Sequence, residues 1–263
     1  MERLQQSEYI RNGYLNAEKR QMAAAVDTHW HDFFELEWVI SGSGSYMIDG
    51  VRYPIAPGML FFITPMNFHR AEAEGCTLYT LMFSGDVGEI AFLSRLAAGA
   101  PLVKQTGAGD FAYYEAVLEG VVRHQDAYLC ATAMLNALLA KLVADMGENV
   151  PPSLPPVKRL ELYMQNHFRS RLTLEMAAKW LMYSPGYLSQ LFKRETGKRF
   201  KSYLNTMRYE YAKKLLAYSD LSVMQVCAES GFEDYPNFVR RFKLYAGMYP
   251  LAYRAQARSA ATV

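Results

Sequence analysis

The feature that most constrains the fold is a repeat near the C-terminal end of the chain. Five positions recur at an offset of 50 residues, with similar or identical side chains. They are Leu188, Phe192, Lys193, Gly197 and Tyr203, matched by Phe238, Phe242, Lys243, Gly247 and Tyr253. A short helical pattern precedes each set, over residues 173–181 and 222–230. The repeat predicts two copies of a helix, a turn and a second helix.

Charge divides the chain at a proline-rich segment. Residues 156–258 carry 18 Lys and Arg against 8 Asp and Glu, a net charge of +10, whereas residues 1–155 carry 10 against 18. Residues 150–156 include four prolines, which fix φ and remove backbone donors, as is typical of a linker. We expect domains over 1–150 and 157–258, joined by a linker over 151–156. The basic C-terminal domain is a candidate polyanion binder, although two soluble domains of unlike composition would show the same split.

Several classes of protein are disfavoured by the sequence. Cys76, Cys130 and Cys227 lie far apart and in no metal-ligand spacing, so we expect reduced, structural cysteines. The N-terminal residues 1–6 are too polar for a signal peptide, and no apolar stretch reaches the length of a membrane span. We therefore expect a cytoplasmic protein without a membrane partner. No catalytic triad, phosphate loop or cofactor fingerprint is present, which argues against most classes of enzyme.

The second helix of each repeat has the pattern of a DNA-reading helix. Ser184 is a suitable N-cap, Pro185 fits the first helical position, and Gly197 fits the residue after the helix. Polar residues face away from an apolar stripe, as a major-groove helix requires. A helix over about 200–219 would separate the two units by roughly 30 Å, close to one turn of B-DNA. The alternative is a pair of helical hairpins whose basic faces are merely solvated.

These residues resemble the AraC/XylS family of transcriptional regulators, from about residue 157 to residue 254. The motifs that carry the resemblance are residues 188–203, Gly231-Phe232-Glu233-Asp234, Arg241-Phe242-Lys243 and Tyr253-Arg254. The resemblance implies a regulator, not an enzyme, whose two recognition helices enter adjacent major grooves of double-stranded DNA. The implied base or backbone contacts are Gly186, Ser189, Gln190, Lys193, Pro236, Asn237, Arg240 and Lys243.

The chain departs from that family's pattern at the turns. Met182 stands where the family usually has Gly, so we expect either an altered turn or a left-handed, strained residue there. Cys227 replaces a usual Ala, and Pro236-Asn237 replaces a common Ser-Tyr pair. Because Gly186 has no side chain for a base contact, we expect the second unit to carry at least as much sequence information as the first.

The N-terminal half has the pattern of a small β-barrel or jelly roll, so the whole chain is predicted to be α+β. Strands are expected over 33–40, 45–48, 51–55, 59–64 and 77–83, with turns at 41–44, 49–50 and 57–58. If the chain is extended from residue 29 to residue 40, one face carries His29, His31, Glu35 and Glu37. The opposite face, which includes Trp30 and Trp38, is apolar and is expected to pack on a helix.

The spacing His29-x-His31-x3-Glu35-x6-Gly42 resembles the first motif of the cupin superfamily, and His69 approximates the histidine of the second. Three interpretations stay open. The first is a metal-free effector pocket formed by His29, His31, Glu35, Glu37 and His69. The second is a divalent metal site on His29, His31, Glu35 and His69, and the third is a structural role.

Residues 111–145 show two apolar helical stripes, which predict either an intramolecular core or, as in the AraC family, a homodimer interface. The leading hypothesis is a regulator that responds to a small-molecule effector, such as a sugar, and works with RNA polymerase. Trp30 and Trp38 would stack on a sugar only if a local twist turned them inward. The alternatives are a metal-dependent cupin enzyme fused to a DNA-binding domain and an architectural factor that needs no ligand.

Overall fold

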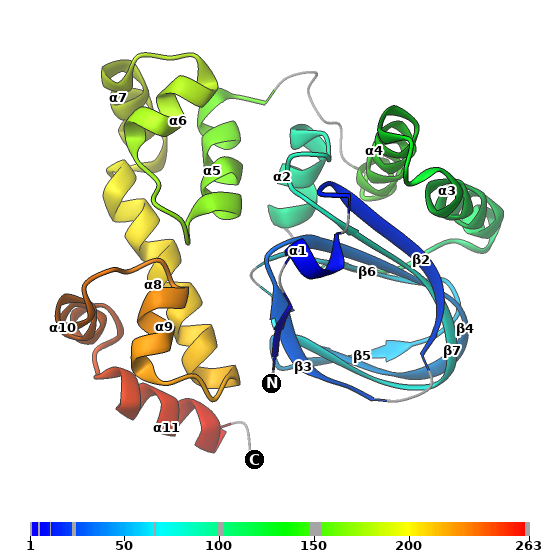
Figure 1. Ribbon diagram of the computed structural model, residues 1–263, viewed down its shortest axis with the longest axis horizontal. Coiled ribbons are helices and arrows are strands. Elements are labelled where there is room, and N and C mark those ends of the chain that lie inside the picture. The colour runs from blue at the N-terminus through cyan, green and yellow to red at the C-terminus, as the bar shows by residue number, and fades with distance from the viewer. Residues whose placement is uncertain are drawn as a thin grey trace. The chain divides into compact units, whose positions relative to one another are not determined.

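The computed structural model describes residues 2–4, 6–10, 12–22, 25–65, 67–98, 102–147 and 154–260. Contacts divide the chain into two compact units, Met1–Leu154 and Pro155–Val263. The first contains a sheet and a few helices, and the second is helical throughout its described part (Figure 1). The predicted α+β fold class is therefore confirmed. Of the predicted linker, residues 151–153 lie outside the described residues, and Pro156 already begins a helix.

Eight strands form one sheet in the N-terminal unit, and the long strands curve around so that the sheet is rolled (Figure 1). The strands are β1 (Glu2–Leu4), β2 (Leu15–Met22), β3 (Val26–His31), β4 (Phe34–Ile48), β5 (Val51–Ile55), β6 (Met59–Ile63), β7 (His69–Phe83) and β8 (Leu102–Gln105). Their order is β1-β3-β7-β4-β6-β8, with β2 also paired to β7 and β5 to β4. All these pairs are antiparallel except β1 with β3.

The predicted turn at residues 41–44 is wrong, because these residues lie inside the continuous strand β4. The register of β4 against β7 shifts around Ser41 and Ser43, and Gly42 and Gly44 have positive φ values of 99° and 149°. A Cβ on Gly44 would overlap the carbonyl oxygen of Glu72 on the paired strand. The Ser-Gly repeat therefore makes an irregularity that lets a long strand bend without ending.

The chain is not extended throughout from residue 29 to residue 40, because Asp32 and Phe33 separate β3 from β4. The strand predicted over 33–40 is confirmed in type, but it begins at Phe34 and continues to Ile48. The strand predicted over 77–83 begins much earlier, at His69. Strands β1, β2 and β8 were not predicted, because their sequences show no clear alternation of apolar and polar residues. β2 adds a polar strand beside β7, and its Glu18, Arg20 and Met22 line the cavity described below.

Helices α3 (Phe111–His124) and α4 (Tyr128–Asp145) pack side by side (Figure 1). Leu135, Leu138, Leu139 and Leu142 of α4 are fully buried within this unit, which supports the interpretation of this stripe as intramolecular core. By length and composition alone α4 could cross a membrane, but a core helix passes the same test. The short helices α1 (Gln6–Tyr9), η1 (Ala108–Asp110) and α2 (Ile90–Ala98) complete this unit's described part.

The C-terminal unit contains the two predicted helix-turn-helix repeats. Its helices are α5 (Pro156–His167), α6 (Leu174–Leu181), α7 (Pro185–Thr196), α8 (Phe200–Tyr218), α9 (Val223–Glu229), α10 (Tyr235–Ala246) and α11 (Pro250–Ala260). Helices α6 and α7 form the first repeat and α9 and α10 the second. The helix α8 between them matches the predicted connector, and its buried side includes Phe200, Leu204, Tyr211 and Leu215.

The ends of the repeat helices follow the sequence signals. The side chains of Thr173, Ser184, Ser222 and Asp234 each accept a hydrogen bond from a backbone N–H of the helix that follows. Ser222 forms a full capping box with Gln225. Such caps satisfy backbone donors that a short helix would otherwise leave unpaired.

Met182 ends α6 in the left-handed conformation, with φ at 59°, which is one of the two alternatives that the sequence left open. Its side chain is 89% exposed, so it contributes little packing in return for the strained backbone. We expect Met182→Gly to stabilise the C-terminal unit by about 1 kcal/mol, since glycine adopts this conformation without a steric penalty. Denaturant unfolding followed by helical circular dichroism measures the change.

Met224 provides a matched control. It is also an exposed methionine, but it lies within helix α9. Met224→Gly should destabilise the same unit by up to about 1 kcal/mol, because glycine is a poor helix former. Equal effects of the two substitutions would contradict a conformational origin for the gain at Met182.

Candidate effector pocket and nucleic-acid interface

The rolled sheet encloses a cavity of about 190 Å³ between β2, β3, β4 and β7. Three of the predicted pocket residues, His29, His31 and Glu35, line it. The other two, Glu37 and His69, contact residues that line it. The structure therefore brings together all five residues predicted for the pocket, although the strand that carries the first two is separate from β4.

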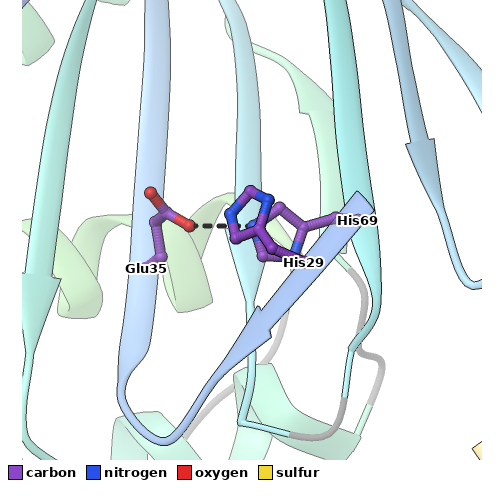
Figure 2. A group of neighbouring side chains, drawn as sticks. All are labelled: His29, Glu35 and His69. Atoms are coloured by element: carbon purple, nitrogen blue, oxygen red, sulfur yellow. Dashed lines mark ion pairs between the residues drawn. The ribbon is translucent and has the colours of Figure 1, made fainter. Parts of the chain in front are cut away.

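Glu35 lies at the centre of this group and is buried. Its Oε2 accepts a hydrogen bond from His31 Nε2 at 3.0 Å. The same oxygen lies 3.2 Å from His69 Nε2 (Figure 2). Burial by itself would raise the pKa of Glu35, but the contacts with His31 and His69 outweigh it and hold the pKa well below its ordinary value. Glu35 is therefore a carboxylate held inside the sheet by imidazoles from β3 and β7.

The three histidines differ in how their ring nitrogens are used. His31 Nδ1 lies 2.8 Å from the carbonyl oxygen of Phe33, so both of its nitrogens face oxygen acceptors. His29 Nδ1 lies 2.8 Å from the carbonyl oxygen of Asp27, and burial together with His69 lowers the pKa of His29. Buried His69 makes no hydrogen bond to the described residues through either nitrogen.

Glu37 has partners that sequence reasoning missed. Arg20 on β2 donates to Glu37 Oε1 at 2.5 Å and to Thr80 Oγ1 at 2.8 Å, and Thr80 donates to Glu37 at 3.3 Å. Burial of Tyr46, reinforced by Glu37 and Glu35, raises the pKa of its phenol well above the ordinary value. In the sequence, Arg20 is marked only by its place in a segment, Leu15 to Met22, that begins and ends with apolar residues. That pattern alone does not predict a strand.

The cavity can hold a small polar molecule. Its volume lies below the usual range of about 300–1,000 Å³ for drug-sized ligands. Its walls carry a positive charge on Arg20 and negative charges on Glu18 and Glu35. The apolar side chains of Met22 and Met82 also line it. Trp30 and Trp38 do not line it, so the conditional prediction of stacking on a sugar is not met. Trp38 instead packs on α3, with its ring centroid 4.4 Å from that of Phe111, as predicted for the apolar face.

The first recognition helix, α7, buries Leu188, Leu191 and Phe192. All four residues predicted to contact DNA on this helix are exposed: Gly186, Ser189, Gln190 and Lys193. Ser189 and Lys193 also line a groove of about 450 Å³, together with Arg199 and Lys201 at the start of α8. A cation-rich groove beside a recognition helix suits a phosphate backbone.

The second recognition helix, α10, buries Phe238 and Phe242, and its predicted contacts Pro236, Arg240 and Lys243 are exposed. Asn237 is half-buried, and its Oδ1 accepts hydrogen bonds from Arg240 Nη2 at 3.2 Å and Arg241 Nε at 3.0 Å. The three side chains therefore form one connected polar group at the start of the helix.

Part of the positive charge in this unit serves the fold. Arg208 donates to the backbone carbonyls of Phe168 and Ser170, and Arg254 donates to those of Leu216 and Leu221. These arginines hold the connections around α8. The net charge of the unit therefore overstates the number of cations that can meet a polyanion.

The Arg20–Glu37 pair tests the electrostatics of the pocket. We expect Arg20→Met to destabilise the N-terminal unit by about 3 kcal/mol, because it leaves buried Glu37 without its cation. Lys19→Met is the matched control, since Lys19 reaches Glu115 only at 3.8 Å on the surface, and should cost less than about 1 kcal/mol. Chemical denaturation measures both, and the double variant Arg20→Met/Glu37→Met should recover much of the loss. A loss for Arg20→Met no larger than that for Lys19→Met would show that Glu37 does not need its cation.

Comparisons with known proteins agree with this arrangement. Residues 16–153 match the model of the AraC-like ligand binding domain, and residues 177–256 match a helix-turn-helix domain. The chain is 24% identical over 249 residues to the HTH-type transcriptional activator RhaS of Escherichia coli O81 (strain ED1a), covering 88% of each protein. It is 38% identical over 96 residues to the uncharacterized HTH-type transcriptional regulator YtdP of Bacillus subtilis (strain 168), covering 36% of this chain and 12% of that protein.

Among solved structures, the chain is similar to the C-terminal domain of AraT, a response regulator from Geobacillus stearothermophilus. That match has 34% identity and a TM-score of 0.38, and covers 40% of this chain and 88% of the other. The family model of the ligand-binding domain alone spans more than half of the chain. The chain therefore belongs to the AraC-type family of transcriptional regulators, with a ligand-binding domain followed by a helix-turn-helix DNA-binding domain.

Proposed function

We propose that this regulator is a cytoplasmic, effector-responsive activator that binds specific promoter sequences through α7 and α10. The observation that supports it best is the repeat itself. Two capped helices with exposed polar starts, α7 and α10, pack on the same 19-residue helix α8. α7 contacts Phe200 and Tyr203 in the first turn of α8, and α10 contacts Tyr209 and Glu210 in its middle. Each of them is the second helix of a helix-turn-helix, which is the helix that enters the major groove in such motifs.

Activation as the direction of control is proposed from the relatives whose printed names are transcriptional activators. RNA polymerase is the partner that an activator requires. The sequence of the operator is set by the side chains of α7 and α10, of which Asn237, Arg240 and Gln190 have the strongest potential to read bases.

The effector is proposed to occupy the cavity beside Arg20, Glu35 and the histidines. A cavity lined by a buried cation and a buried carboxylate favours a small, hydroxyl-rich or charged metabolite over an apolar one. The walls come from β2, β3, β4 and β7. A bound molecule that fits one arrangement of these four strands better than another stabilises the arrangement that it fits. Its effect on DNA binding is limited by its difference in affinity between those arrangements.

A homodimer is proposed through the outer face of α3 and α4. The leucines of α4 are buried, but Tyr113, Tyr128 and Leu129 are exposed, with Leu129 80% accessible. This apolar surface, and not the buried leucine stripe that the sequence indicated, is the part of 111–145 that a second copy would cover.

Arg240→Ala tests sequence reading. We expect specific binding to weaken by roughly 1–3 kcal/mol, about 5- to 150-fold, with relaxed preference at one base position. Lys243→Ala should instead weaken binding to all sequences similarly and lower the salt slope by about one. Fluorescence anisotropy on sites selected from a random library, over a salt series, separates the two effects.

Arg52→Ala is the control for Arg240→Ala, because it removes the same charge from an exposed position on β5 in the N-terminal unit. Its DNA binding should match that of the unmodified chain. If Arg240→Ala left the base preference unchanged, the role of α10 as a sequence reader would be lost. If the unmodified chain did not distinguish any selected site from random duplex, the regulator would lack its proposed specificity.

A thermal-shift screen of sugars, amines and hydroxy acids tests the effector pocket. A true effector should raise the melting temperature and change DNA affinity in the same concentration range. Val26→Phe, which intrudes on the cavity, should abolish both effects, whereas Val51→Phe on exposed β5 should leave them intact. A hit that survives Val26→Phe binds elsewhere and would refute this pocket as its site.

A further inference from the structure

We propose that His29, Glu35 and His69 form a binding site for one divalent transition-metal ion. One ligand atom from each side chain lies within 4.8 Å of the other two (Figure 2). The residues come from β3, β4 and β7, and His29 and His69 are direct partners in the pairing of β3 with β7. The backbone ladder of the sheet therefore fixes the cluster. This inference does not depend on the proposed response to an effector.

His69 supplies the first independent observation. It is 1% exposed, and neither ring nitrogen makes a hydrogen bond to the described residues. Its Nε2 lies 3.2 Å from Glu35 Oε2, which is ion-pair distance, without making a hydrogen bond. Buried polar groups in folded proteins nearly always have a partner, and an ion is one of the few that fits between an imidazole and a carboxylate.

His29 supplies the second observation. Its Nδ1 lies 2.8 Å from the carbonyl oxygen of Asp27, which can only accept a hydrogen bond. The proton is therefore on Nδ1, and Nε2 keeps its lone pair. Metal-bound histidines usually have this arrangement, in which a backbone carbonyl fixes the tautomer through the nitrogen that does not bind the metal.

His31 is not a ligand in the proposed site, although it was one of the four possible ligands in the metal interpretation of the sequence. Phe33 and Glu35 already occupy its two nitrogens. It instead holds the carboxylate of Glu35 toward His69, so it is a positioning residue. Carboxylates that bind metals are commonly held in this way by a neighbouring donor.

Two imidazoles and one carboxylate favour zinc, iron, nickel or copper over magnesium or calcium, which prefer oxygen ligands. Ligand atoms lie about 2.0–2.2 Å from such ions, so two of them in a tetrahedral site are about 3.3–3.6 Å apart. His69 Nε2 and Glu35 Oε2, which are 3.2 Å apart, already have nearly this spacing. The separations that involve His29 are within 4.8 Å and would have to close by up to about 1.5 Å. The partly exposed side chain of His29 is the one that would move. Three protein ligands leave coordination positions for water or a small oxygen-bearing molecule.

The test is a titration of the full chain, stripped of metal with a chelator, with Co²⁺ as the probe. Visible absorption should rise to saturation at one ion per chain, and Zn²⁺ should displace the signal. Zn²⁺ should also raise the melting temperature of the unmodified chain, since it binds only the folded site. The absence of saturable uptake by the folded chain would overturn the proposal.

Variants assign the ligands. His69→Gln and Glu35→Gln should each lower the affinity at least 100-fold, whereas His31→Gln should lower it only about 10- to 100-fold. His124→Gln is the matched control, an exposed histidine at the end of α3 far from the cluster in sequence, and should change nothing. Circular dichroism verifies that each variant is folded. Uptake that persists in both folded His69→Gln and Glu35→Gln would exclude this site.

The result is separable from the regulator's function. The titration contains neither DNA nor effector, so a chain that binds no metal can still regulate a promoter. Conversely, a chain that binds Co²⁺ through these residues has a metal site whether or not DNA binding responds to it.

Discussion

The N-terminal unit depends on the burial of two carboxylates on one strand. Glu35 and Glu37 of β4 face the interior of the rolled sheet, where an unpaired charge is too costly to persist. Their partners come from three other strands: Arg20 on β2, His31 on β3, and His69 and Thr80 on β7. The strands that wrap around β4 therefore do more than cover apolar surface, because each of them also balances charge. Because both buried carboxylates need partners, the polar groups of the candidate pocket gather around Glu35 and Glu37.

The helical unit was the more predictable half, since its signals are local. Ser184 and Pro185 mark a helix start, Gly197 and Gly247 mark helix ends, and the apolar spacing identifies the buried side. Even at Met182, an exception to the pattern, the sequence indicated a turn that would be either altered or strained, and the structure shows the strained alternative. Here each element is determined within a dozen residues, so sequence reasoning and structure agree closely.

The sheet was less predictable, because long-range pairing decides it. The alternation of His29, His31, Glu35 and Glu37 correctly indicated a shared polar face, yet nothing local showed that the chain turns at Asp32. Gly42 and Gly44 look like a turn in sequence, but they allow the bend of a strand whose neighbour, β7, lies far along the chain. Arg20 was missed for the same reason. Its importance arises only when β2 pairs with β7 and presents the guanidinium to Glu37.

The polar group at the start of α10 has a consequence for how DNA sequence is encoded. The amide oxygen of Asn237 accepts hydrogen bonds from Arg240 and Arg241. It can therefore accept a hydrogen bond from an adenine only after at least one of these two bonds breaks. Released arginines become available to guanines or phosphates nearby. Under the proposed reading of bases by α10, recognition at neighbouring base pairs is therefore interdependent, and the affinity for an operator would differ from the sum of the contributions of its individual base pairs.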